Sequence, residues 1–541
     1  MADPIHSAPQ HRAAEFLPKI ITVWREGYHF ADLGADAMAG LSVAIVALPL
    51  SMAIAIASGL GPERGLFTAI VGGFIVSALG GSRYQIGGPA GAFIVGVSAC
   101  VAQIGVPGLM VATFLSGFIL MAAGGLKLGS YVKFLPYPVT IGFTSGIAVI
   151  IFTSQIKELL GLHLAGAEPP AVLDKLGALW VARDTLSGQA MAVALGTIVA
   201  LQTIKKLRPH WPNLAMAVVG VSLAVWALRL PIDLVGDRFG TLPRFLPAPV
   251  WPDLSWEMIQ RSLPFALQFS LLGAITGLLS AQVADGLSGN HHRPAIELFA
   301  EGAANIAVAF FGGVYATGAV ARTVTNHSAG AKGPVAGMLH AVFVLGFMLA
   351  LAPLVSFVPM AVFAGLLSVV AWNMAGKAQF WMLLRTSRSD AVIVIVTFLL
   401  VVFRDLTEGI VVGFALAGLV FLQRMSHSAV IDTGEDADRA DRVVVRLSGP
   451  YFFGAAAQTG AVLDQIAEHP RHFVLDLTAL DYVDSSGARA LDLLALRTQR
   501  KGGQMVLLGV RPSQRRVLEK AGLAPPLVRY VETLAELDSA P

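Results

Sequence analysis

Long stretches without any charged residue constrain this chain more than any other feature of its sequence. They recur through the first 430 residues, at 37–62, 65–82, 84–126, 134–156, 185–204, 262–284, 302–321, 333–376, 391–403 and 409–423. An α-helix needs about 20 consecutive apolar residues to cross the hydrocarbon core of a membrane. Several stretches exceed that length and contain a Gly or Pro break, as at Pro107 and Pro353. The pattern predicts an α-helical membrane domain with about fourteen crossings or part-crossings.

Composition excludes an ordinary soluble enzyme and separates the chain into two parts. Only 13% of the 541 residues are charged, against about 25% in soluble domains. Residues 431–541 hold 28 of the 73 charged residues, so this part alone has the composition of a soluble domain. We therefore predict an N-terminal segment, a membrane domain in two halves, a linker and a soluble tail domain, at 1–36, 37–426 (halves 37–230 and 262–426), 427–441 and 442–541.

The charges also bear on partners and orientation. A net charge of +3 is too small to indicate a nucleic-acid partner, and the single cysteine, Cys100, excludes an intrachain disulfide. Acidic residues before Ala37 argue against a secretory signal peptide. Loops rich in Lys and Arg, such as that at Lys205, alternate with loops of mixed charge, such as that at Glu63. The positive-inside rule then predicts an inner- or plasma-membrane protein, surrounded by lipid, whose N-terminus and tail are cytoplasmic.

Two apolar stretches contain helix-breaking residues at matching places. The first break, 87–92, reads Gly-Gly-Pro-Ala-Gly-Ala, and the second, 312–318, reads Gly-Gly-Val-Tyr-Ala-Thr-Gly. Each lies about fifty residues into its half of the membrane domain, and such matched interruptions mark the substrate site of inverted-repeat transporters. Helices that begin there direct unpaired backbone N–H groups at the site, which favours an anion. The alternative is that the small residues only allow close helix packing.

Arg322 strengthens the prediction of an anion site. It follows the second break in an otherwise charge-free stretch, and an arginine inside a membrane domain is costly unless it faces a cavity or a partner. Beside a helix N-terminus it would add a fixed positive charge for an anion. The alternative is that Arg322 extends from a helix end to the lipid headgroups.

Three stretches of the membrane domain carry motifs of a known family. They are 39–49 in the first crossing, Gly87-Gly88-Pro89 in the first break, and a long run that includes Glu297, Gly302, Asn305, Thr317, Arg322, Thr323 and Asn326. In these motifs the chain resembles the sulfate permease (SulP) family of anion transporters.

The resemblance implies fourteen segments in two inverted repeats of seven, with the third and tenth segments as half-helices that meet at the substrate. A core bundle would move against a gate bundle as an elevator, within a homodimer. Residues of both breaks and of two neighbouring helices would bind the substrate: Leu50, Ile54, Gly88, Pro89, Ala90, Gly91, Thr276, Gly318, Ala319, Val320, Ala321 and Arg322.

One departure from the family pattern bears on coupling. Many bacterial relatives carry Asp or Glu in the eighth segment where this chain has Thr276, and some have Glu where it has Leu50. A cation or proton site needs a carboxylate, and Asp285 is the nearest one remaining, which makes it the candidate coupling residue. We therefore expect sodium-independent transport that responds to membrane voltage unless an exchanged anion balances the charge. If transport depends on a proton gradient instead, Asp285 or His340 would carry the proton.

The tail has the pattern of a small α/β domain. Short apolar runs at 442–447, 472–477 and 504–508 predict strands, and amphipathic stretches at 455–468 and 485–500 predict helices. Through Asp476-Leu477 and Asp484-Ser485-Ser486-Gly487 it resembles a STAS (sulfate transporter and anti-sigma-factor antagonist) domain. The resemblance makes Ser486 a candidate regulatory phosphorylation site, while a serine that only caps the following helix is the alternative.

These observations predict secondary active transport of a small inorganic or carboxylate anion. Sulfate is the first choice, with bicarbonate or a dicarboxylate as the others. A nucleobase permease of the same architecture, an anion channel or exchanger without cation coupling, and a non-transporting sensor are the alternatives. We expect no enzymatic activity, cofactor or metal, because no nucleophile–base pair or metal-ligand pattern is evident.

Overall fold

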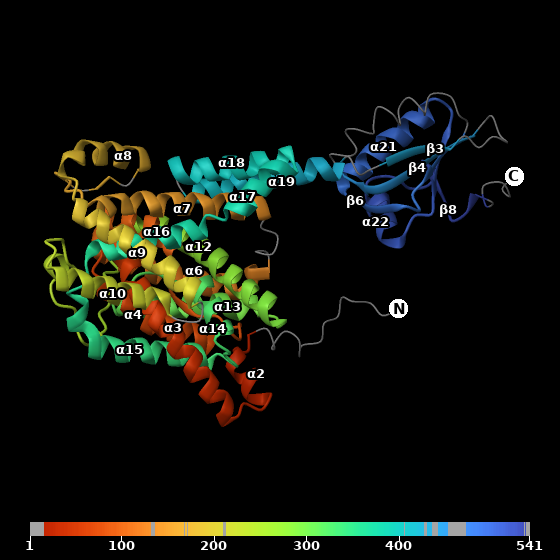
Figure 1. The fold of residues 1–541 in the computed structure, drawn as a ribbon. Coiled ribbons are helices and arrows are strands. Elements are labelled where there is room, and N and C mark those ends of the chain that lie inside the picture. The colour runs from red at the N-terminus through yellow and green to blue at the C-terminus, as the bar shows by residue number, and fades with distance from the viewer. Residues whose placement is uncertain are drawn as a thin grey trace. The chain divides into compact units, whose positions relative to one another are not determined.

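Helices build the first of the two units into which the chain divides, Met1–Phe414, and a mixed sheet with helices builds the second, Ala415–Pro541 (Figure 1). We describe each unit by itself. The computed structural model describes residues 16–130, 136–166, 168–169, 171–208, 212–404, 406–426, 430–434, 442–452, 472–534 and 536.

The helices of the membrane domain follow the predicted apolar stretches. They are α2 (Lys19–Arg25), α3 (Phe30–Ala57), α4 (Pro62–Phe67), α5 (Gly73–Leu79), α6 (Ile94–Gly125), α7 (Tyr137–Leu160), α8 (Val172–Val181), α9 (Gly188–Leu207), α10 (Asn213–Leu228), α11 (Val235–Phe239), α12 (Trp256–Ser288), α13 (Pro294–Phe310), α14 (Val320–Ser328), α15 (Val335–Val355), α16 (Met360–Met374), α17 (Lys377–Thr386), α18 (Arg388–Phe403) and α19 (Leu406–Ser426). Among the described residues, nine helical runs are long and apolar enough to cross a membrane. The prediction of a helical membrane protein is confirmed.

The break expected at Pro107 divides α6 into two segments. Gly105 has a φ of 70° inside this helix, so its backbone is not helical there. Glycine tolerates that conformation, and Pro107 cannot donate the hydrogen bond that would continue the first segment. The stretch 84–126, too long for one crossing, is thereby split as expected.

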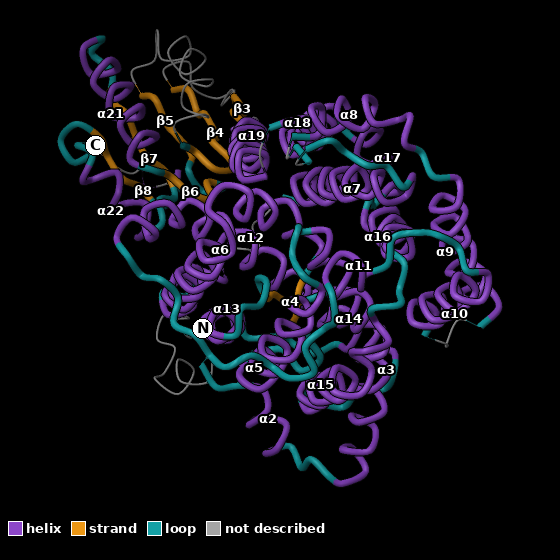
Figure 2. The backbone as a smooth tube through the Cα atoms, turned by 90° about the vertical axis from the view of Figure 1, so that its left-hand side faces the viewer, coloured by secondary structure: helices purple, strands orange, loops and turns teal. Residues whose placement is uncertain are grey.

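The two predicted breaks of the membrane domain pair with each other. Strand β1 (Gly87–Pro89) lies antiparallel to strand β2 (Ala316–Gly318), with Gly88 opposite Thr317. The pairing continues as a hydrogen bond from Ala319 N–H to the Ile86 carbonyl oxygen, 2.9 Å long. Figure 2 shows this pair as a short orange segment among the helices of the first unit. Segments about 230 residues apart in the chain therefore meet backbone to backbone.

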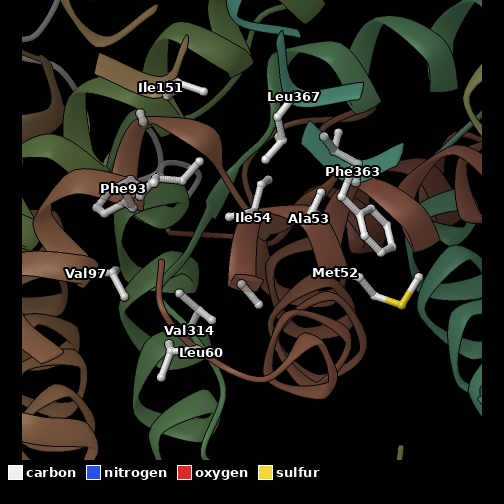
Figure 3. Close-up of a cluster of buried hydrophobic side chains, with 14 of the residues drawn as sticks. Met52, Ala53, Ile54, Leu60, Phe93, Val97, Ile151, Val314, Phe363 and Leu367 are labelled. Carbon is white, nitrogen blue, oxygen red and sulfur yellow. The ribbon is translucent and has the colours of Figure 1, made fainter. Parts of the chain in front are cut away.

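A buried hydrophobic cluster surrounds this crossing. It includes Ile54 of α3, Phe93 beside β1, Val314 before β2, and Leu367 of α16 (Figure 3). The Phe93 ring stacks on the Tyr315 ring, with 4.3 Å between the ring centroids. The half-helix starts are thus fixed by apolar packing from several helices as well as by the strand pairing.

The second unit contains a sheet in the order β3–β4–β5–β7–β8, with β6 paired to β4. Its elements are β3 (Val430–Gly434), β4 (Arg442–Tyr451), β5 (His472–Asp476), β6 (Leu480–Val483), α21 (Ser485–Arg500), β7 (Gln504–Leu508), α22 (Pro512–Lys520) and β8 (Val528–Val531). The three predicted strands and the helix 485–500 are confirmed. The predicted helix 455–468 lies outside the described residues.

Two details of the tail differ from the sequence prediction. The segment 430–434, assigned to the linker, is strand β3 and pairs antiparallel with β4. Val430, Ile431 and Thr433 are β-branched residues, which favour strands. The cap of α21 is Asp484 rather than a serine, since Asp484 Oδ1 accepts a hydrogen bond of 2.6 Å from Gly487 N–H. Ser486 is exposed in the first turn of that helix.

Asp476, part of the motif that identified the tail, is held at the end of β5. Its carboxylate accepts hydrogen bonds from Thr478 Oγ1 at 2.6 Å and from Arg446 Nε at 2.8 Å. The pKa of Asp476 is lowered, because burial, which acts in the opposite direction, is outweighed by these two hydrogen bonds. Asp476 therefore has a structural role in joining β5 to β4 and to the turn that follows.

Candidate functional site

Each strand of the crossing leads directly into a helix whose N-terminus has no side-chain cap. After β1 a short 3-10 turn, η2 (Gly91–Phe93), begins at Ala90 and continues into α6. After β2, α14 begins at Ala319. Neither Ala90 nor Ala319 can accept a hydrogen bond through its side chain, so the first N–H groups of both helices need another partner. An anion is the ligand that such N–H groups and the positive helix ends favour.

The backbone at both helix starts is accessible. Ala90, Gly91 and Ala319 are half-buried, and Val320 and Ala321 are exposed. A β-carbon at Gly91 would lie 3.4 Å from Ile151 Cδ1 and 3.8 Å from Met374 Sδ, so α7 and α16 face this end of the crossing. The predicted binding residues of both breaks are therefore brought together at one place between several helices.

Arg322 is completely buried and points across to the first half of the domain. Its Nη2 donates a 2.9 Å hydrogen bond to Ser51 Oγ of α3. A β-carbon at Gly88 would lie 2.1 Å from Arg322 Nη1, so the guanidinium lies directly against β1. Within the described part of the chain, Nε and Nη1 of Arg322 have no hydrogen-bond partner. The alternative that Arg322 extends to the lipid headgroups is wrong, because no part of the side chain reaches the surface.

The remaining predicted binding residues differ in what they contact. Leu50 and Ile54 of α3 are buried members of the hydrophobic cluster that surrounds the crossing. Thr276 of α12 is half-buried, and its Oγ1 lies 3.1 Å from Thr317 Oγ1 of β2. Thr276 therefore touches the crossing directly, whereas Leu50 and Ile54 contribute apolar packing beside it.

Residues of α13 hold β2 in place. Asn305 accepts a 2.8 Å hydrogen bond from Ala316 N–H and donates one of 2.7 Å to the Ala316 carbonyl oxygen. Glu301 Oε1 accepts from Gly318 N–H at 2.9 Å and from Thr317 Oγ1 at 3.2 Å. These side chains satisfy backbone groups of β2 that no further strand could reach.

Residues of α13 and α14 also hold the segment that leads into β1. Glu297 Oε2 accepts hydrogen bonds from Gly81 N–H at 2.6 Å and Ser82 N–H at 2.8 Å. Thr323 Oγ1 accepts a 3.2 Å bond from Ile86 N–H, and Asn326 donates a 2.9 Å bond to the Tyr84 carbonyl oxygen. The polar positions of the long family motif thus fix the backbone of the crossing.

Glu301 was missed by the sequence analysis, and the expectation that Asp285 is the nearest carboxylate is wrong. Glu301 is fully buried and contacts β2, while Asp285 lies near the C-terminus of α12 and accepts hydrogen bonds from His292 N–H and Nδ1 at 2.9 and 2.6 Å. Glu301 was not among the candidate residues, because the charge-free stretch starts directly after it, at Gly302. The available signal was its position four residues after Glu297, on one face of a helix.

No cluster of three or more His, Cys, Asp or Glu side chains that could hold a metal ion occurs among the residues with a described placement. Ser51 is a further contact that the sequence analysis did not identify, since nothing in the apolar run around it indicates its partner. Among the residues that the structure describes, the crossing offers helix N-termini, the buried cation of Arg322, hydroxyl groups and the buried carboxyl group of Glu301.

Comparison with known proteins assigns both parts of the chain to known families. The sequence model of the sulfate permease family matches residues 33–397, and that of the STAS domain matches residues 435–537. One relative is the Bacillus subtilis (strain 168) protein named "Putative sulfate transporter YvdB". It is 37% identical over 513 residues, which cover 92% of this chain and 95% of the relative. The bicarbonate transporter BicA of Picosynechococcus sp. is 29% identical over 531 residues, 92% of each chain.

Solved structures share the fold. The transmembrane domain of a cyanobacterial bicarbonate transporter, BicA, is 30% identical with a TM-score of 0.63, covering 72% of this chain and 98% of that one. Murine Solute Carrier 26 family member A9, an anion transporter solved in the inward-facing state, has a TM-score of 0.85 at 18% identity, covering 99% of this chain and 95% of that one. The second likeness bears on the fold alone.

Proposed function

The chain belongs to the sulfate permease family and carries a C-terminal STAS domain, and we propose that it is a secondary active transporter of a small anion. The family is one of transporters, not enzymes, and the chain is an integral membrane protein. Sulfate is the substrate that we propose first, since the relative that is 37% identical is named for it. Bicarbonate is the second candidate, because two relatives and one solved structure are named as bicarbonate transporters.

The observation that carries the proposal is the crossing of β1 and β2 with its two uncapped helix N-termini. An anion bound beside Ala90, Gly91, Ala319 and Val320 would receive backbone N–H groups from both helices. Arg322, buried behind Gly88, would supply a positive charge in a region of low dielectric, where it acts more strongly than in water. Family and geometry therefore support the same site.

We further propose how the substrate moves. Helices α7 and α16, which face Gly91, would belong to a gate, and β1, β2, α6, α13 and α14 would move as a core in an elevator motion. The fold would consist of two inverted repeats of seven segments, assembled as a homodimer in the inner or plasma membrane with cytoplasmic N-terminus and STAS domain. The positive-inside distribution of Lys and Arg supports this orientation.

Uptake by proteoliposomes tests the proposal. The purified chain should accumulate labelled sulfate, with labelled bicarbonate as the second substrate and labelled uracil as the test of a nucleobase permease. Liposomes that contain Arg322→Ala protein of equal thermal stability serve as the control. Uptake of uracil without uptake of either anion would contradict the proposed function.

A further inference from the structure

Glu301 is a buried acidic side chain at the crossing with one oxygen that the fold does not use. Oε1 accepts the hydrogen bonds from Gly318 N–H and Thr317 Oγ1. Within the described residues Oε2 is buried and has no hydrogen-bond partner. A β-carbon at Gly277 would lie 1.8 Å from Oε1 and 2.6 Å from Oε2. The carboxyl group is therefore packed flat against α12, with one oxygen on β2 and the other unpaired.

An ionised carboxyl group in this position is costly, because half of its negative charge is buried without a donor. A proton on Oε2 removes the charge and leaves the two hydrogen bonds at Oε1 in place, since a neutral carboxyl oxygen also accepts. The geometry is thus compatible with both protonation states, and only the charge beside β2 differs between them.

Among the described charged side chains near Glu301, Glu301 is the one that hydrogen-bonds to β2. On its own helix, Glu297 lies one turn away, and its Oε2 accepts hydrogen bonds from Gly81 N–H and Ser82 N–H. Glu297 Oε1 is also unpaired among the described residues, but this side chain holds the segment before β1 and not β2. The phenol of Tyr315 packs against Gly273 of α12. Arg322 of α14 is directed to Ser51, and His340 of α15 faces Gly73 rather than β2.

The remaining elements that pack on this side present uncharged groups or distant ones. From α12, Thr276 faces β2, and Asp285 at the end of that helix is paired with His292. From α6, the contacts with α13 involve Gly117 and Met121. Glu301 is therefore the described carboxyl group that accepts a hydrogen bond from Gly318, the residue before the N-cap of α14.

We infer that Glu301 takes up one proton from solution when an anion binds at the half-helices and releases it when the anion leaves. This inference rests on the proposed function. Gly318, which donates to Glu301, immediately precedes Ala319, where α14 begins. An ionised Glu301 would repel the anion through a region of low dielectric, and a neutral one would not. Binding of the anion and of the proton must then favour each other equally.

The step balances without another reactant. A proton from water joins Glu301 Oε2 as the anion binds, and no other bond changes. With sulfate, which stays doubly negative near neutral pH, binding of the anion together with one proton adds a net charge of −1 to the site. Transport therefore stays sensitive to membrane voltage and becomes sensitive to the proton gradient, with Glu301 in the place of the carboxylate that position 276 lacks.

Sulfate binding to the full-length purified chain, measured between pH 6 and pH 8 by isothermal titration calorimetry, tests the inference. In the wild type the apparent affinity should fall by about tenfold per pH unit once Glu301 ionises. A pH-indicator dye in weakly buffered solution should report proton uptake when sulfate is added. Glu301→Gln keeps an oxygen for Gly318 and Thr317, so it should bind sulfate with an affinity that varies by less than about twofold over this range and without proton uptake.

Asp285→Asn is the matched control, since it removes a carboxylate outside the crossing, and it should keep the wild-type pH dependence. A pH dependence that persists in Glu301→Gln, or that disappears in Glu297→Gln instead, would overturn the inference while leaving anion transport intact. Wild-type protein that binds sulfate without taking up a proton would also overturn it. Wild-type protein that neither binds nor transports sulfate or bicarbonate would overturn the proposed function and this inference with it.

Discussion

The two half-helix starts share a backbone geometry but differ in the side chains around them. In both, three extended residues lead into a helix that begins at an alanine without a side-chain cap. The first start consists of Gly88, Pro89 and Ala90 and has no charged side chain of its own. The second is surrounded by polar groups, with Thr317 in the strand, Glu301 bonded to it and Arg322 in the first turn of its helix.

The difference indicates that the two halves of the crossing have separate tasks. In the first half, Gly88 has no side chain and so leaves room for the guanidinium of Arg322, which a side chain at this position would displace. The second half provides the charge and directs it back across the crossing, since Arg322 contacts β1 and Ser51 of α3. A binding site made by both halves therefore depends on one cation.

Removal of that cation should have the largest effect. Arg322→Ala should lower sulfate uptake by about 10- to 150-fold, because a hydrogen-bonded charge in a buried site contributes about 1.5–3 kcal/mol. Ser51 would lose the guanidinium as a partner but keep its hydrogen bond to the Ala47 carbonyl oxygen. Uptake at equal amounts of reconstituted protein measures the effect. Arg385→Ala, which removes an exposed cation outside the crossing, is the control. Unchanged uptake in Arg322→Ala would reduce the guanidinium to a structural contact.

Substitution of the glycine that receives the cation should have the next largest effect. Gly88 has a φ of 152°, and its added β-carbon would lie 2.1 Å from Arg322 Nη1. Gly88→Ala should therefore displace Arg322 and lower uptake by more than about tenfold, at a cost in stability of about 1–3 kcal/mol. Ala90→Gly on the same strand end should leave uptake near the wild-type value. Equal losses in both variants would show that the strand, and not the contact with Arg322, is sensitive.

An added carboxylate at position 276 should have a moderate effect. Thr276 Oγ1 of α12 lies 3.1 Å from Thr317 Oγ1, so Thr276→Asp would place a negative charge beside β2, the strand that Glu301 already contacts. We expect the affinity for sulfate to fall by about tenfold, since like charges repel strongly in a low-dielectric site. Addition of sodium should restore part of it if the new carboxylate binds a cation. Thr276→Asn, of similar size and neutral, should stay close to the wild type in a binding titration.

Deletion of the tail should have the smallest effect on binding. Both half-helix starts lie in the first unit, and the second unit has its own hydrophobic core. A chain that ends after α19, without residues 427–541, should bind sulfate within about twofold of the full-length protein. Binding can be measured by calorimetry on the purified, monodisperse truncated protein. Loss of binding by such protein would show that the substrate site depends on the STAS domain.

The sequence allowed the backbone of the site to be predicted, because breaks in apolar helices are local features. Glycines in both stretches, 87–92 and 312–318, and a proline in the first interrupt what would otherwise be helix, and the structure has strands there. The strands at 442–447, 472–477 and 504–508 were predictable for the same reason, since their apolar runs have the length of buried strands.

The side-chain contacts of the site could not be predicted, because they join residues far apart in the chain. Ser51 and Arg322 are 271 positions apart, and nothing local indicates that they are paired. Glu301 was not singled out, because a charge-free stretch stops at any acidic residue and therefore excludes it. Its Oε1 accepts a hydrogen bond from Gly318 N–H, 17 positions further along the chain, and only the folded chain brings the two together.

The position of a bound anion tests the central claim most directly. Selenate resembles sulfate and can be located by the anomalous signal of selenium in crystals of the full-length protein. The account predicts a single selenate between the two half-helix starts, within hydrogen-bond distance of backbone N–H groups near Gly91 and Val320 and close to Arg322. Selenate bound elsewhere, in protein that still transports sulfate and with this crossing vacant, would contradict it.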